Sequence, residues 1–143
     1  MEAGQYFNRR RKKNLIISVL MVYDPWRKIF NCGECDDKRG RGCLRPKRKA
    51  IVEIACMCGG SRHCDICKGT GEIKIKRCPG SYMRSSEIIS LMPYFFRYKA
   101  TWEYPDKMGR MEQPIKLTDA LDLMSAVSNR KEQEQLEKIH GRK

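Results

Sequence analysis

Eight cysteines crowd the middle of this 143-residue chain, and their spacing is typical of metal-binding thiolates. They are Cys32, Cys35, Cys43, Cys56, Cys58, Cys64, Cys67 and Cys78. In Cys32 to Cys35 and in Cys64 to Cys67, two residues separate the cysteines. At this interval both sulfur atoms can reach one ion, while the turn between them points backbone N–H groups at the thiolates. The spacing therefore predicts zinc ligands in a reduced compartment rather than disulfides.

Glycines follow the tightest cysteine pair. Residues 64–71 read Cys-x-x-Cys-x-Gly-x-Gly, and glycine lets the backbone pass close to an ion. This unit resembles one repeat of the cysteine-rich zinc domain of DnaJ-type chaperones, in which such repeats pair to bind two zinc ions with four cysteines each. The resemblance covers residues 32–80, with only this repeat intact, and it implies two zinc ions. Because nothing resembles a J domain, we do not expect co-chaperone activity.

Eight cysteines divide into two sites of four. We assign Cys58, Cys64, Cys67 and Cys78 to one site, on the expectation that two flanking strands bring them together. Cys32, Cys35, Cys43 and Cys56 then form the other. An exchange of Cys56 with Cys58 stays open, and His63 is an alternative ligand to a thiolate. Both sites have four protein ligands and leave no position for water, so we expect structural zinc and no enzyme activity.

The formal charge of +13 is unevenly distributed. Residues 1–84 hold 20 Lys and Arg against 8 Asp and Glu, whereas residues 85–143 hold 10 against 9. Basic clusters of this kind bind phosphates and release counterions, although solubility or attraction to an acidic protein would also account for them. The candidate nucleic-acid contacts are Arg9, Arg10, Arg11, Lys12, Lys13, Arg45, Lys47, Arg48 and Lys49. Contact with DNA or RNA is therefore a prediction, without specific base reading.

An apolar stretch, residues 15–22, follows the first basic run and resembles the start of a secretory signal. No small-residue cleavage site follows it, and it is far shorter than the roughly 20 apolar residues that cross a bilayer. We therefore expect a buried strand or short helix after a solvated basic arm, and no membrane partner.

The pattern predicts a small α+β protein in three parts. Residues 1–31 are the basic arm and apolar segment, residues 32–80 a zinc-stapled β-hairpin module, and residues 81–143 a helical region. Residues 51–55 and 73–75 read as the two strands of the hairpin.

Two helices are expected in the third part. Ser85 or Ser86 can cap a helix that buries Ile88, Ile89, Leu91 and Met92, and Pro93 is expected to kink or restart it. Thr118 opens the longest helix. Its apolar stripe comprises Leu117, Ala120, Leu121, Met124 and Val127.

A second resemblance covers residues 78–127. A Cys-Pro pair, a helix with aromatics and a Gly-x-x-Glu-Gln-Pro turn at residues 109–114 before an amphipathic helix resemble small proteins encoded in tailed-phage morphogenesis clusters. This implies a virion or assembly role in the cytoplasm of an infected bacterium, with phage structural proteins as partners. We therefore expect a non-enzymatic assembly protein whose basic face contacts nucleic acid. The alternative is a zinc-finger transcription regulator.

Overall fold

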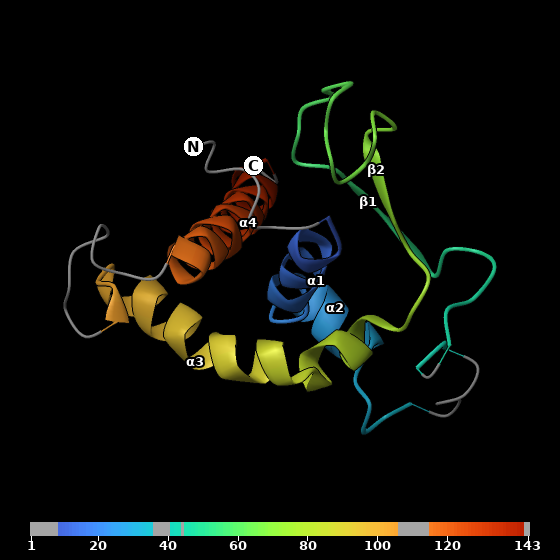
Figure 1. The fold of residues 1–143 in the computed structure, drawn as a ribbon, viewed down its shortest axis with the longest axis horizontal. Helices are drawn as coiled ribbons and strands as arrows, with labels where there is room; N and C mark the ends of the chain where they lie inside the picture. Colours follow the sequence, from blue (N-terminus) through green and yellow to red (C-terminus); the bar gives the residue numbers. More distant parts are fainter. Residues whose placement is uncertain (1–8, 36–40, 44, 106–114, 142–143) are drawn as a thin grey trace.

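The computed structural model describes residues 9–35, 41–43, 45–105 and 115–141. Its elements, in chain order, are α1 (Arg9–Leu20), α2 (Asp24–Ile29), β1 (Val52–Ala55), β2 (Glu72–Ile75), the 3-10 helix η1 (Pro79–Arg84), α3 (Ser86–Thr101) and α4 (Ile115–His140). Helix α1 packs against α4 and η1, and α3 packs against the same two elements. Figure 1 shows α1 near the centre, with the β-hairpin on one side. Helices with a small hairpin confirm the α+β prediction.

Helix α1 is buried on every side over its second half. Its buried residues are Leu15, Ile16, Ile17, Ser18, Val19 and Leu20. Ser18, the polar member, satisfies its hydroxyl by donating to the carbonyl oxygen of Leu15 at 2.7 Å. A helix surrounded by other elements needs apolar side chains all round. The apolar stretch predicted as a strand or short helix is therefore a core helix.

The basic run predicted as a solvated arm instead forms the first turns of α1 from Arg9 onward. Its side chains meet acceptors on the cysteine-rich segment. Arg9 Nε donates to the carbonyl oxygen of Ile66 at 2.9 Å, and Lys12 pairs with Asp65 at 2.5 Å. Positive charge at a helix N-terminus opposes the helix dipole. These contacts offset that cost and join α1 to the cysteine loop.

The predicted hairpin is confirmed. Strands β1 and β2 pair antiparallel, with Val52 opposite Ile75 and Ala55 opposite Glu72. Ile73 and Ile75 are buried while Lys74 is exposed, as the period of two along a strand requires. One face of the hairpin is therefore apolar and lies toward the core.

Helix α3 confirms one capping prediction. The Ser85 hydroxyl accepts from the backbone N–H of Ile88 at 3.3 Å. The helix then runs unbroken through Pro93, which lies on its exposed side. There water can reach the carbonyl that proline leaves without its usual donor.

The buried face of α3 differs from the prediction at one residue. Its buried residues are Ile88, Leu91, Met92 and Phe95. Ile89 was expected among them, but it is 59% exposed, whereas Ile88 is 1% exposed. One residue along a helix turns the side chain by about 100°, which carries Ile89 out of the buried stripe.

Helix α4 begins at Ile115, three residues before the predicted Thr118. The predicted stripe is largely confirmed: Ala120, Leu121, Met124 and Val127 are buried, and Leu117 is partly buried. The turn at residues 109–114, on which the phage resemblance depends, lies outside the described residues. Within the described ranges, every helix is too short or too polar to span a bilayer.

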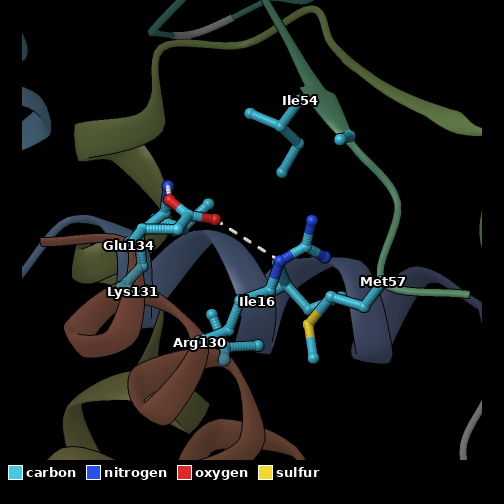
Figure 2. A pocket seen from close by; sticks show the side chains of 9 residues that line it. Ile16, Ile54, Met57, Arg130, Lys131 and Glu134 are labelled. Atoms are coloured by element: carbon cyan, nitrogen blue, oxygen red, sulfur yellow. Dashed lines mark hydrogen bonds and ion pairs between the residues drawn. The ribbon is translucent and has the colours of Figure 1, made fainter. Parts of the chain in front are cut away.

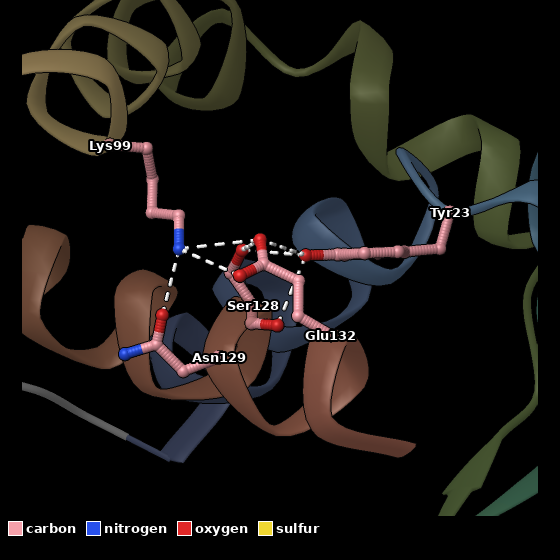
Figure 3. Close-up of polar contacts among 5 residues, drawn as sticks. All are labelled: Tyr23, Lys99, Ser128, Asn129 and Glu132. Atoms are coloured by element: carbon pink, nitrogen blue, oxygen red, sulfur yellow. Dashed lines mark hydrogen bonds and ion pairs between the residues drawn. The ribbon is translucent and has the colours of Figure 1, made fainter. Parts of the chain in front are cut away.

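A polar cluster joins the helices where α1 gives way to α2 (Figure 3). The Tyr23 hydroxyl lies 2.6 Å from the Ser128 hydroxyl, and Lys99 of α3 donates to Asn129 Oδ1 at 2.7 Å. Glu132 accepts from both Tyr23 and Lys99. Burial raises the pKa of Tyr23 above its ordinary value, so the hydroxyl stays a donor to higher pH than an exposed tyrosine. These contacts fix α3 and the α1–α2 connection onto α4.

Candidate metal centre and basic face

Four cysteines gather at the loop end of the hairpin. Cys56 directly follows β1, and Cys67 lies five residues before β2 begins at Glu72. With Cys58 and Cys64 they form a group whose sulfur atoms all lie within 4.8 Å of one another. The sulfur atoms of Cys56 and Cys64 are 3.6 Å apart, as are those of Cys58 and Cys67.

These separations distinguish a metal site from disulfides. A disulfide holds its sulfur atoms about 2.05 Å apart, and all eight cysteines are unbridged. Four sulfurs bound tetrahedrally to zinc at about 2.3 Å would lie about 3.8 Å from each other. The observed 3.6 Å between sulfurs fits the second arrangement. The cluster is therefore positioned to hold a metal ion, and a set of four thiolates favours zinc over harder ions.

The two spaced glycines shape the backbone under this cluster. Gly69 and Gly71 have positive φ angles of 81° and 74°, which residues with a Cβ rarely adopt. A Cβ at Gly69 would lie 3.1 Å from the carbonyl oxygen of Arg62. The backbone N–H of Cys56 donates to the carbonyl oxygen of Gly71 at 2.8 Å and closes the loop. The two glycines of the Cys-x-x-Cys-x-Gly-x-Gly motif are therefore explained by the backbone conformation of this loop.

Backbone donors also act on the sulfur atoms. Burial alone would raise the pKa of Cys67, but N–H donation from Gly71 and Gly69, together with hydrogen bonds from Cys58 and Cys64, lowers it to about 6. Burial raises the pKa of Cys56 to about 12. The hydrogen bonds at Cys67 therefore favour its thiolate, the form in which cysteine binds a metal ion.

The predicted grouping of the cysteines is wrong at one position. The fourth member of the cluster is Cys56, where Cys78 had been assigned, so Cys32, Cys35, Cys43 and Cys56 do not form the second set. In an antiparallel hairpin, the residue after β1 and the residue before β2 share one end. Cys78 follows β2 and lies at the other end. His63 is exposed and outside the cluster.

Three basic segments meet on one face of the molecule. The backbone N–H of Lys47 donates to the carbonyl oxygen of Lys76 at 2.8 Å, and the Lys13 ammonium donates to the carbonyl oxygen of Lys74. These contacts bring residues 45–49 and the start of α1 beside the end of β2. Between them lies an open hollow of about 590 Å³. Its basic lining residues are Arg9, Lys13, Lys68, Lys74, Lys76 and Arg77.

The positive charges of this hollow lie close together. Burial lowers the pKa of Lys13, and the neighbouring charges of Arg9 and Lys76 lower it further. Among the described residues, Arg77 Nε is buried without a hydrogen-bond partner. An adjoining hollow shares Lys13, Arg77 and Tyr82 and adds Arg10. An anion bound here would relieve the repulsion among these cations.

The candidate nucleic-acid residues divide into two groups. Arg9, Arg10 and Lys13 line the two hollows, and the side chains of Arg45, Lys47, Arg48 and Lys49 are exposed on the adjoining segment. Arg11 and Lys12 are instead ion-paired with Glu87 and Asp65. Sequence reasoning missed Tyr82, a half-buried aromatic at both hollows, because an isolated tyrosine in a short 3-10 helix carries no pattern.

A smaller hollow lies where the hairpin meets the helices (Figure 2). Ile16 of α1, Ile54 of β1, Met57 and Val127 of α4 supply its apolar lining, and Arg130, Lys131 and Glu134 line its rim. Cys56 and Cys67 belong to the same buried apolar cluster as the residues of α1 and α4. The loop that carries the cysteine cluster, residues 56–71, therefore packs against the helical core.

Comparison with protein-family models, with curated proteins and with solved structures found no match for this chain.

Proposed function

We propose that this chain is a zinc-stapled binding protein, not an enzyme, whose basic face contacts the phosphate backbone of a nucleic acid. The observation that carries the proposal is that basic residues of α1 and of residues 68–77 line one hollow, beside a cysteine cluster positioned to hold metal. Zinc bound at the cluster has the role of a staple, because its four ligands leave no position for substrate.

Phosphate is the ligand chemistry that fits this face best. Arginine and lysine side chains neutralise phosphates, and Arg9, Lys13, Lys68, Lys74, Lys76 and Arg77 line this hollow. Tyr82, which lines both hollows, gives an aromatic surface on which an unpaired base can stack. Backbone contact and stacking do not depend on base identity. We therefore expect sequence-tolerant, salt-dependent binding.

The test is the salt dependence of binding to a labelled DNA duplex of about 20 base pairs and to a single strand of the same sequence. In the test variant Arg10→Gln/Lys76→Gln, two exposed charges of this face are removed. A matched control, Arg97→Gln/Lys116→Gln, removes one arginine and one lysine that line neither hollow.

For the duplex, the slope of log association constant against log salt should fall in magnitude by about two in the test variant, because each neutralised phosphate contributes about 0.9 to that slope. The control should keep the wild-type slope. Equal effects of both variants would show that binding depends on the overall charge of the chain and not on this face, which would contradict the proposal. Binding that does not respond to salt would overturn the phosphate contact itself.

A second candidate function, docking of a protein partner in an assembly, is favoured by the outer face of α3. Ile89, Pro93, Phe96 and Ala100 recur at helical spacing and are all exposed. An exposed apolar stripe of this kind is typical of interaction surfaces. The simplest occupant is a second copy of the chain. Sedimentation of wild type and of Ile89→Glu/Phe96→Glu over a range of concentrations would detect self-association through this stripe.

A further inference from the structure

Cys78 lies at the end of the hairpin opposite the first cluster, and other cysteines surround it. Its side chain is 3% exposed and packs with Met21 and Phe30, and Cys43 lies against the same small apolar group. Cys32, Cys35 and Cys43 are the remaining cysteines outside the first cluster. A second set of four sulfurs is thus available in this region.

Two of these sulfurs flank one glycine. A Cβ built on Gly80 would lie 3.4 Å from the sulfur of Cys32 and 3.8 Å from the sulfur of Cys78. The same Cβ would lie 2.9 Å from the carbonyl oxygen of Phe30, so a side chain at this position would clash. The backbone here passes close to sulfur, as it does beside the first cluster.

The third sulfur comes from the loop before β1. The side chains of Cys78 and Cys43 are hydrogen-bonded, and Cys32 is also near Cys78. Burial raises the pKa of Cys78, the backbone N–H of Gly80 lowers it, and the neighbouring Cys43 and Cys32 raise it. Gly80 lies two residues after Cys78, and its backbone N–H donates to the Cys78 sulfur. This hydrogen bond favours the thiolate, as backbone donors do at metal ligands. Cys32, Cys43 and Cys78 are therefore neighbours in space, although 46 positions separate the first from the last in sequence.

Contacts with the backbone hold this loop in place. The Arg77 guanidinium donates to the carbonyl oxygen of Cys43 at 3.2 Å, and Arg41 donates to the carbonyl oxygen of Ile29. A Cβ at Gly42, whose φ is 74°, would lie 3.0 to 3.1 Å from the carbonyl oxygens of Arg45 and Lys76. The loop therefore approaches the chain that leads out of β2 into Cys78.

We propose that Cys32, Cys35, Cys43 and Cys78 form a second four-cysteine zinc centre. Cys35 completes the set because two residues separate it from Cys32, an interval at which both sulfurs reach one ion. In the described residues, only the first cluster has all its sulfurs within 4.8 Å of one another. Zinc must therefore draw the second set closer together. The centre would join the end of α2, the loop before β1 and the start of η1.

This proposal is independent of nucleic-acid binding and is tested on the full chain by native mass spectrometry. Wild type purified without chelator should carry two zinc ions. Cys78→Ser and Cys32→Ser should each carry one, and so should the matched control Cys58→Ser, which removes a ligand of the first cluster. Wild type with a single ion, or Cys78→Ser with two, would overturn the second centre.

A second test of the proposed centre is alkylation mapping of the wild-type chain, which does not depend on whether a cysteine variant folds. With iodoacetamide, all eight thiols should react slowly until a strong chelator removes the metal. Rapid labelling of Cys32, Cys35, Cys43 and Cys78 while the first cluster stays protected would contradict the proposal. So would a disulfide between any two of these four in protein prepared under nitrogen.

Discussion

Cys67 combines burial with a lowered pKa. It is buried in the apolar core cluster, which raises its pKa, yet hydrogen bonds from Gly71 and Gly69, together with those from Cys58 and Cys64, lower the pKa to about 6. An ordinary buried cysteine would keep its proton and pack as an apolar side chain. A sulfur prepared to carry charge inside a core requires a compensating cation. A metal ion bound jointly with the three other sulfurs, all within 4.8 Å, would supply it.

Removal of this ligand should separate the two parts of the fold. In Cys67→Ser we expect the metal ion of the first cluster to be lost and the hairpin loop to unfold, because metal binding contributes folding free energy. The helical signal in circular dichroism should largely persist, since α1 and α3 both pack on α4. Unchanged thermal stability together with wild-type metal content would contradict this role.

The two glycines after Cys67 permit a matched comparison. Both have positive φ angles, so alanine at either position should cost about 1 to 2 kcal/mol of folding free energy. Gly69→Ala should cost more than Gly71→Ala. A Cβ at position 69 meets the Arg62 carbonyl oxygen at 3.1 Å, whereas at position 71 nothing lies within 4 Å. Urea unfolding of both variants measures the difference, and the reverse order would contradict the steric account.

The metal ligands could be predicted from the sequence as residue types but not as a set. The Cys-x-x-Cys interval and the glycines predicted that Cys64 and Cys67 share one site, and their sulfurs do lie in one cluster. Choosing their partners required knowing which end of the hairpin each remaining cysteine occupies. Cys56 and Cys78 stand just outside opposite ends of the paired strands, and periodicity does not reveal this.

At the scale of elements, α3 has one face in the core and one in solvent. Ile88 and Ile89 are adjacent and identical in chemistry, but only Ile88 is buried. Ile88→Ala should destabilise the protein by about 2 to 5 kcal/mol, and Ile89→Ala should change stability by no more than about 0.5 kcal/mol. Thermal or urea unfolding checks both. A large loss for Ile89→Ala would mean that the outer face of α3 is covered.

The elements were predicted with different success for physical reasons. Helix α4 and the strands show clear periods of 3.6 and 2, which burial on one face produces. Helix α1 is buried on all sides from Leu15 to Leu20, so it has no polar face and no period by which to recognise it. Its basic first turns looked like an arm because their acceptors, Asp65 and the Ile66 carbonyl, are more than 50 residues away in sequence.

At the scale of the whole molecule, the loop that carries the cysteine cluster also forms part of the basic face. Cys67, Thr70 and Lys74 line the same hollow as Arg9 and Lys13 of α1. The positive residues were visible in the sequence, but their convergence depends on the hairpin and on α1 packing beside it. The sequence predicted a basic face and its candidate residues at 9–13 and 45–49, but it did not reveal the hollow beside β2 that Arg9 and Lys13 line.

Metal removal should therefore weaken nucleic-acid binding. After treatment with a strong chelator, the affinity for the labelled duplex should fall, because the loop that forms one wall of the hollow loses its staple. Fluorescence anisotropy measures the affinity, and far-ultraviolet circular dichroism confirms that the helices remain. Full affinity in the metal-free, still helical protein would show that the face does not depend on the cysteine cluster.

The most direct test of this account is the metal environment of the first cluster alone. The Cys32→Ser/Cys78→Ser chain, which removes two ligands of the proposed second centre, should bind one zinc ion per molecule. X-ray absorption should then show four sulfur atoms at about 2.3 Å around the ion. A chain free of zinc, with disulfides joining Cys56 to Cys64 and Cys58 to Cys67, would contradict the account.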